Sequence, residues 1–255
     1  MVTTTSNNEE VTKTAEEAVG LRWDDRTVRL LGSEAVGRLA RSRMLVVGVG
    51  GVGGYAAEML VRAGVGHLRL VDADNVDITN VNRQLIATLP VIGQPKVGLL
   101  AKRFRNINSE VTVETVQEFV TPDNIAVILE GGFDFVLDAI DTVAPKVALV
   151  SYCMKHNIPI ISSMGAGGRT DPTKVGYANL WETREDGLAR AVRQRLRKLG
   201  LHRPLKVVAS SEAPHTASLI EIGTTNKRTS YGTLATIPAL FGIFMANYAI
   251  MRTAQ

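Results

Sequence analysis

Residues 45–54, LVVGVGGVGG, constrain the fold of this 255-residue chain more than any other stretch. The apolar run RMLVVGV is typical of a strand buried on both faces of a sheet. The glycines after it permit a tight turn, and GGYAAEMLVRAGV then carries apolar residues at helical spacing. A second apolar strand, HLRLVDAD, follows this helix. The stretch therefore predicts a strand–helix–strand unit with glycines at its first turn.

Strands and helices continue to alternate over residues 44–164. The later elements are the helix KVGLLAKRFRNINS, the strand VTVETVQEFV, a short helix, the strand FDFVLDAID, the helix APKVALVSYCMKHN and the strand IPIISSMG. This alternation predicts an α/β fold with a doubly wound, mainly parallel, Rossmann-like sheet and helices on both faces. Residues 165–255 lose the strict alternation, and we expect them to form a smaller part on the same sheet. Residues 21–255 are then one domain, with a nucleotide-binding half at 44–164.

Three further sequence features predict where in the cell the protein is found. Residues 1–20 are polar and rich in Thr, Asn and Glu, so we expect a disordered tail without a signal peptide. The single cysteine, Cys153, excludes an internal disulfide and a cysteine-rich zinc cluster. The apolar segment TIPALFGIFMANYAIM is shorter than the roughly 20 residues of a membrane span and contains Pro238 and Asn247. We therefore expect a cytoplasmic protein with a buried core helix and no membrane contact.

The glycine loop predicts a nucleotide phosphate site. Gly48, Gly50, Gly51 and Gly53 allow the backbone to approach a phosphate at a helix N-terminus, which offers free N–H donors. Asp72, at the end of the second strand, can accept hydrogen bonds from ribose hydroxyls. The alternative is that these glycines only permit close packing of strand and helix. The spacing also satisfies the G-x-G-x-x-G pattern of dehydrogenases, so the loop alone does not identify the ligand.

Three later clusters favour ATP. DITNVNRQL brings Asn80, Arg83 and Gln84 together, and a guanidinium among amides suits a polyphosphate. In GQPKV, Lys96 begins a helix, where its ammonium can neutralise departing pyrophosphate. In LDAIDT, Asp141 follows the end of a strand, and a carboxylate beside phosphates is a ligand for Mg²⁺. Each cluster alone also fits a solvated loop, but a hydride-transfer enzyme has no use for all three.

The stretches GVGGVGG, LVDADNVDITNVNRQ, GQPK and DAIDT resemble the ubiquitin-activating-enzyme superfamily, which includes the bacterial activators of sulfur-carrier proteins. The resemblance implies a homodimer that adenylates a carboxylate, and it assigns the residues above to ATP and Mg²⁺. It adds Asp74 to the nucleotide site. It also implies that an N-terminal arginine, matched by Arg26 in DRTVRLLG, acts across the dimer.

Three further stretches, SSMGAGGRTDPTKV, NLWETREDGLARAVRQRLRKLG and SYGTLATIPALFG, resemble one tRNA-modifying branch of this superfamily. In that branch, ATP activates the carboxylate of threonylcarbamoyladenosine beside the tRNA anticodon, and ring closure releases AMP. The implied partner is tRNA with this base, and a monovalent cation is left open as a further cofactor. The alternative is an adenylyltransferase for the C-terminal Gly-Gly of a ubiquitin-like sulfur carrier, with a carrier or sulfur-transfer protein as partner. A nucleotide-binding scaffold is disfavoured by Arg83, Lys96 and Asp141.

The segment DGLARAVRQRLRKLGLHRPLK predicts a basic amphipathic helix. Its apolar positions recur at helical spacing, at Leu188, Val192, Leu196 and Leu199. The segment carries seven Lys and Arg residues and one Asp, so it accounts for the chain's net charge of +4, and such charge suits nucleic-acid phosphates. A solvated helix face is the alternative. The expected tRNA contacts are Arg190, Arg193, Arg197 and Arg203.

Overall fold

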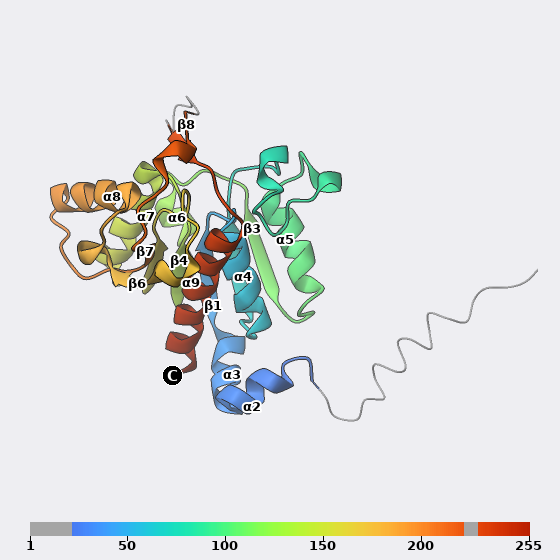
Figure 1. Cartoon of the computed structure of the whole chain (residues 1–255). Helices are drawn as coiled ribbons and strands as arrows, with labels where there is room; N and C mark the ends of the chain where they lie inside the picture. Colours follow the sequence, from blue (N-terminus) through green and yellow to red (C-terminus); the bar gives the residue numbers. More distant parts are fainter. Residues whose placement is uncertain (1–21, 222–228) are drawn as a thin grey trace, which may run out of the picture.

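The computed structural model describes residues 22–221 and 229–255, which are built around a seven-stranded sheet (Figure 1). The strand order is β3-β2-β1-β4-β5-β7-β6. The strands are β1 (Arg43–Val47), β2 (His67–Val71), β3 (Thr112–Val116), β4 (Phe135–Asp138), β5 (Ile160–Ser163), β6 (Val175–Asn179) and β7 (Lys206–Ser210). All neighbours pair in parallel except β6, which is antiparallel to β7. The predicted doubly wound, mainly parallel sheet is confirmed.

Helices cover both faces of the sheet (Figure 1). They are α2 (Asp25–Leu31), α3 (Ser33–Arg41), α4 (Gly53–Arg62), α5 (Lys96–Arg105), α6 (Ile125–Ile128), α7 (Val143–His156), α8 (Gly187–Lys198) and α9 (Thr236–Ala254). Short 3₁₀ turns are η1 (Ile78–Asn80), η2 (Leu89–Val91), η3 (Pro172–Lys174), η4 (Leu180–Glu182) and η5 (Thr216–Ser218). A two-stranded ribbon pairs β8 (Leu219–Glu221) with β9 (Thr229–Tyr231).

The apolar run of β1 is buried on both sides because successive side chains of a strand point to opposite faces. Met44 and Val46 belong to a core with α3, α4, α5 and α9. Leu45 and Val47 belong to a second core with α6 and α7. Residues of α7, α8 and β7 form a third cluster. The strand that leads into the glycine loop is therefore held rigidly from both faces.

Helix α9 is the predicted core helix. It packs on α4 so closely that a Cβ on Gly242 would overlap the main-chain oxygen of Val52. Phe241 and Met245 are fully buried, whereas Ile243 is exposed. By length and composition alone α9 could cross a membrane, but in this structure it packs against α4 and the sheet. The contacts with α4 help to fix the helix that begins at the glycine loop.

The segment that supplies β6 was not predicted as a strand, because its short run VGYAN carries little apolar alternation and lies at the sheet edge. The expected N-terminal tail lies outside the described residues. Strands β6 and β7 come from residues 165–255 and extend the sheet that residues 44–164 build.

Candidate nucleotide site

The loop between β1 and α4 lies at the carboxyl ends of the strands, where α/β sheets bind ligands. Gly48 has φ +82°, and a Cβ there would lie 2.9 Å from the main-chain oxygen of Ala139. A Cβ on Gly53 would overlap the carbonyl oxygen of Gly48. At Gly50, in contrast, a Cβ would meet only the Gln84 side chain, at 3.5 Å from Nε2. Packing thus requires glycine at 48 and 53, whereas at position 50 a Cβ would make only an ordinary contact.

Asp72 is anchored directly to the glycine loop. One carboxylate oxygen accepts a hydrogen bond from the N–H of Val49 at 2.7 Å, and the other accepts from the N–H of Asp74 at 2.9 Å. Burial raises the pKa of Asp72, although the charge of Lys96 and these N–H donors act in the opposite direction. The predicted ribose ligand is therefore fixed beside the predicted phosphate loop.

Lys96 is buried, not a solvated surface lysine. Its side chain is 4% exposed, and its Nζ lies 2.8 Å from the Oδ2 of Asp74, whose side chain is 56% exposed. Because Lys96 is the first residue of α5, the helix start fixes where its ammonium lies. The exposed carboxylate of Asp74 can move away when phosphates approach, which would leave the Lys96 charge for them.

Arg83, the arginine predicted to contact phosphates, lies in the loop that follows η1. The buried Asn80 accepts the N–H of Asp77 on its Oδ1 at 3.1 Å, so this amide oxygen is occupied in holding the turn. Arg83 donates from Nη1 to the main-chain oxygen of Thr79 at 2.7 Å and to Oδ1 of Asn82 at 3.0 Å. Only one of its nitrogens is used in these contacts, so the rest of the guanidinium fork stays available for an anion.

Gln84 and the glycine loop offer a further polar contact for a nucleotide. The Oε1 atom of Gln84 is buried and has no hydrogen-bond partner among the described residues. An unpaired buried acceptor is costly, and a ligand N–H or O–H would satisfy it. Gly51 lies against Arg83, with the Cβ position 3.6 Å from its Cγ. The residues present therefore fit an adenosine phosphate.

Asp138, the last residue of β4, and Asp141, three residues later, differ sharply in burial. Asp138 is fully buried in an ion pair with Lys146, so it is not available to a metal ion. Asp141 is exposed and follows residues 139–140, which the glycine loop contacts. The described residues contain no cluster of three or more acidic, histidine or cysteine side chains that could hold a metal alone. Mg²⁺ commonly takes one or two carboxylates together with substrate phosphates, so Asp141 fits this role.

The structure thus brings one set of predicted residues to a single edge of the sheet. These are Gly48, Gly50, Gly51, Gly53, Asp72, Asp74, Asn80, Arg83, Gln84, Lys96 and Asp141. Arg26 does not join them within one chain. It is exposed on α2, and α2 and α3 lie at the opposite end of the sheet from the loop before α5 (Figure 1).

The predicted tRNA-binding arginines separate into two kinds. Arg193 donates to the main-chain oxygen of Leu180 at 3.1 Å and to the hydroxyl of Thr183, which ties α8 to η4. Arg203 donates to the main-chain oxygen of Met154 at 2.9 Å, at the end of α7. Both guanidinium groups therefore stabilise the fold. Arg193 is half-buried, so the expectation of a guanidinium free for phosphates needs correction there. Arg203 is exposed and bonds only through Nη1, and its contact with tRNA stays a prediction.

Arg190 and Arg197 lie on α8 and are exposed. The Arg197 guanidinium lies over the ring of Trp181, 5.5 Å from its centroid. The predicted apolar face is correct at Val192 and wrong at Leu199, which is 50% exposed because α8 ends one residue before it.

Sequence reasoning missed a buried arginine beside the site. Arg169 donates to the main-chain oxygens of Gly165, Glu185 and Glu212 and pairs with Asp186 at 3.3 Å. The same Asp186 carboxylate caps α8. These contacts fix the loop after β5, next to β4. In the sequence, Arg169 is a charged residue in a loop and is expected to be exposed. Only the glycines of GAGGRT indicate that this loop is tightly packed.

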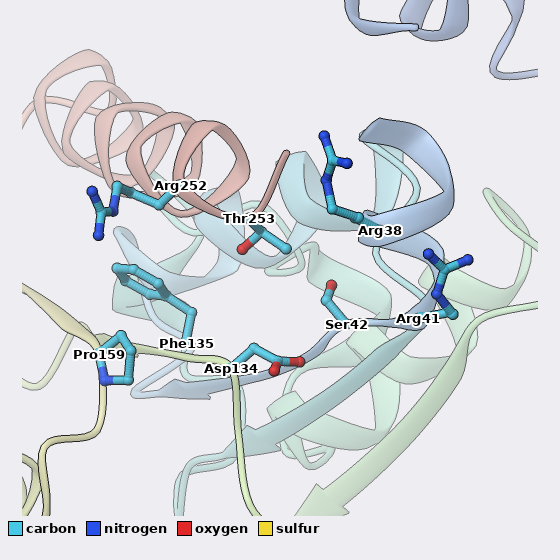
Figure 2. A pocket seen from close by; sticks show the side chains of 8 residues that line it. All are labelled: Arg38, Arg41, Ser42, Asp134, Phe135, Pro159, Arg252 and Thr253. Carbon is cyan, nitrogen blue, oxygen red and sulfur yellow. The ribbon is translucent and has the colours of Figure 1, made fainter. Parts of the chain in front are cut away.

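A hollow of about 390 Å³ lies at the opposite, amino end of the sheet. Its lining includes Arg38, Arg41, Ser42, Asp134 and Arg252. Figure 2 shows Asp134 and Ser42 near the middle, while the three guanidinium groups point apart. The lining carries three guanidinium groups and one carboxylate, and the glycine loop lies at the other end of the sheet.

A parallel sheet that carries a glycine loop, an anchored carboxylate and a buried lysine at one edge defines a nucleotide-binding α/β protein. The chain belongs to the ThiF family, whose sequence profile matches residues 24–254. The resemblance noted from the sequence motifs is thereby confirmed.

The chain is similar to named members of one branch of this family. The tRNA threonylcarbamoyladenosine dehydratase of Bacillus subtilis (strain 168) is 40% identical over 229 residues, which are 87% of this chain and 90% of the relative. The Escherichia coli (strain K12) protein of the same name is 45% identical over 67% of this chain and 64% of its own length. The crystal structure of the E. coli protein in complex with ATP has a TM-score of 0.82 at 37% identity, covering 90% of this chain and 92% of that chain.

Proposed function

We propose that this protein is an ATP-dependent tRNA-modifying enzyme that cyclises threonylcarbamoyladenosine beside the anticodon, with net loss of water. The observation that carries the proposal is the meeting of four separate segments at one glycine loop. Those segments supply the anchored Asp72, the buried Lys96, the arginine Arg83 and the turn before Asp141. Similarity to named dehydratases over nearly the whole chain supports the choice of substrate.

The first step activates a poor acyl donor. An oxygen of the threonyl carboxylate attacks the α-phosphorus of ATP, the bond to the β-phosphate breaks, and pyrophosphate leaves. Lys96 and Arg83 stabilise the negative charge that builds on pyrophosphate. Asp74 holds the Lys96 ammonium in place before the phosphates arrive. Asp72 and Gln84 orient the adenosine.

The second step closes the ring. The carbamoyl side of the same group attacks the activated acyl carbon, and AMP leaves with the carboxylate oxygen, which accounts for the lost water. The reaction is intramolecular and gains from proximity. It needs no protein thiol. Burial raises the pKa of Cys153 to about 12, so its thiol stays protonated and unreactive at physiological pH.

Mg²⁺ belongs to the proposal as a second component. Asp141 would hold the ion, and the bound ion would neutralise phosphate oxygens during activation. Lys96 and Arg83 supply the protein's own positive charge at the same edge.

The proposal also includes a homodimer in a cytoplasmic setting. Arg26 lies on α2, far from the glycine loop of its own chain (Figure 1). In this proposal, Arg26 acts at the nucleotide in the site of a second copy. The tRNA would contact the basic face of α8, through Arg190 and Arg197.

Pyrophosphate release tests the substrate class. The purified protein with ATP is given tRNA that carries threonylcarbamoyladenosine, tRNA without it, or a small carrier protein that ends in Gly-Gly. We expect release only with the first substrate. Release with the carrier protein alone would instead support the adenylyltransferase function.

A further inference from the structure

Lys146 and Asp138 form an ion pair inside the protein. Their charged atoms lie 2.7 Å apart, and both side chains are 0% exposed. The Lys146 ammonium also donates to the hydroxyl of Ser162 at 3.1 Å and to the main-chain oxygen of Ser163 at 2.9 Å. Its three donors thus have three acceptors. The pair joins α7 to the carboxyl ends of β4 and β5.

A contribution to folding stability does not by itself explain why this ion pair is buried. Removing two charges from water is costly, and apolar side chains of similar volume often replace a buried pair without loss of stability. The pair is absent from the chemistry described above, because neither side chain reaches solvent. Its location is the better guide to its role.

The pair lies directly beneath the turn that leads to Asp141. The second oxygen of Asp138 accepts the N–H of Ile140 at 3.1 Å. The N–H of Ala139 donates to the main-chain oxygen of Val47 at 2.8 Å. Ala139 is also the residue against which Gly48 and Gly53 pack. Residues 139–140 therefore form the floor of the glycine loop, and Asp138 determines their conformation.

We propose that Lys146 is a positioning residue of the nucleotide site. By holding Asp138 between β4 and β5, it fixes residues 139–141 so that Asp141 faces the phosphates of the nucleotide. The inference rests on the proposed function, since it assigns Asp141 to Mg²⁺. It predicts that the pair matters for the Mg²⁺-dependent part of ATP binding.

The test replaces both charges together, in the variant Asp138→Leu/Lys146→Met, which leaves no unpaired buried charge. Calorimetry measures ATP affinity with Mg²⁺ and with a chelator, and thermal unfolding checks the fold. Lys155→Met is the matched control, because Lys155 lies exposed on the same helix. We expect the double variant to remain folded and to lose about tenfold of the affinity gained from Mg²⁺, as for the loss of an outer-shell metal partner. The control should bind as the wild type does.

An unchanged Mg²⁺ effect in the folded double variant would overturn the inference. If that variant fails to fold, Asp138→Asn/Lys146→Met is measured by the same criterion, because an asparagine keeps an acceptor for the Ile140 N–H. Its Mg²⁺ effect should be reduced, and a wild-type value would overturn the inference equally. A wild-type protein that binds no ATP would refute the proposed function itself. The two failures are therefore distinguishable.

Discussion

Gly53, at the start of α4, faces the carbonyl oxygen of Gly48 so closely that no Cβ fits between them. At Gly50, in contrast, a Cβ would make only an ordinary contact with the Gln84 side chain. The glycines therefore have different roles, although they form one motif in the sequence.

This difference predicts opposite effects of two matched substitutions. Gly53→Ala should destabilise the fold by about 1–3 kcal/mol, because the new methyl group has no room. Gly50→Ala should leave the melting temperature nearly unchanged and weaken ATP binding by about tenfold, or roughly 1.4 kcal/mol. Thermal unfolding and ATP calorimetry on both variants provide the check. Wild-type ATP binding by a folded Gly50→Ala protein would show that the phosphates lie elsewhere.

Arg83 should be needed for adenylation and not for folding. Among the described residues, its guanidinium hydrogen-bonds to the neighbouring loop, at Thr79 and Asn82. Arg83→Ala should therefore fold normally and lower the rate of pyrophosphate release on the order of 10²–10³. Rates close to those of wild type in the purified, folded variant would remove Arg83 from the catalytic residues.

If Arg26 acts in the site of a second copy, inactive variants should complement each other. Arg26→Ala and Lys96→Ala are each expected to be inactive as pure dimers. In a mixed dimer, one site combines an intact Lys96 with the partner's intact Arg26 and should recover activity. Differently tagged subunits allow such dimers to be isolated and assayed. Absence of activity in verified mixed dimers would contradict the sharing of Arg26.

Arg190 and Arg197, which are exposed on α8, should bind tRNA. Arg193, whose guanidinium is hydrogen-bonded to η4, should not. Arg190→Glu/Arg197→Glu is expected to weaken tRNA binding and to reduce the slope of log affinity against log salt by about 1 for each lost phosphate contact. ATP binding should be unchanged. In Arg193→Ala, the main loss should be in thermal stability, because its guanidinium bonds Leu180 and Thr183. Equal tRNA affinity of the double variant at several salt concentrations would exclude α8 as the docking surface.

Local sequence pattern was sufficient for most of the fold. The run RMLVVGV predicted a strand buried on both faces, and β1 has that burial. In contrast, β6 was missed because an edge strand of five residues depends on its neighbour β7 more than on its own composition.

In the candidate site too, some residues were predicted from local sequence and others were not. Asp72 and Lys96 were predicted because each lies at a recognisable element boundary next to the glycine motif. The pairing of Lys146 with Asp138 was not predicted, since it also requires Ser162 of a strand that follows 24 residues later. Arg193 was predicted as a phosphate contact because its spacing on α8 is that of an exposed stripe. Only the packing of η4 against α8 shows where its guanidinium goes.

The most direct test of the account is the mass of the modified nucleoside in tRNA after reaction. The purified protein is incubated with ATP and tRNA that carries threonylcarbamoyladenosine, and the tRNA is then digested to nucleosides for mass spectrometry. The proposed function predicts that threonylcarbamoyladenosine is replaced by a nucleoside lighter by one water. One AMP and one pyrophosphate should form for each conversion. An unchanged nucleoside in the presence of protein that binds ATP would contradict the account.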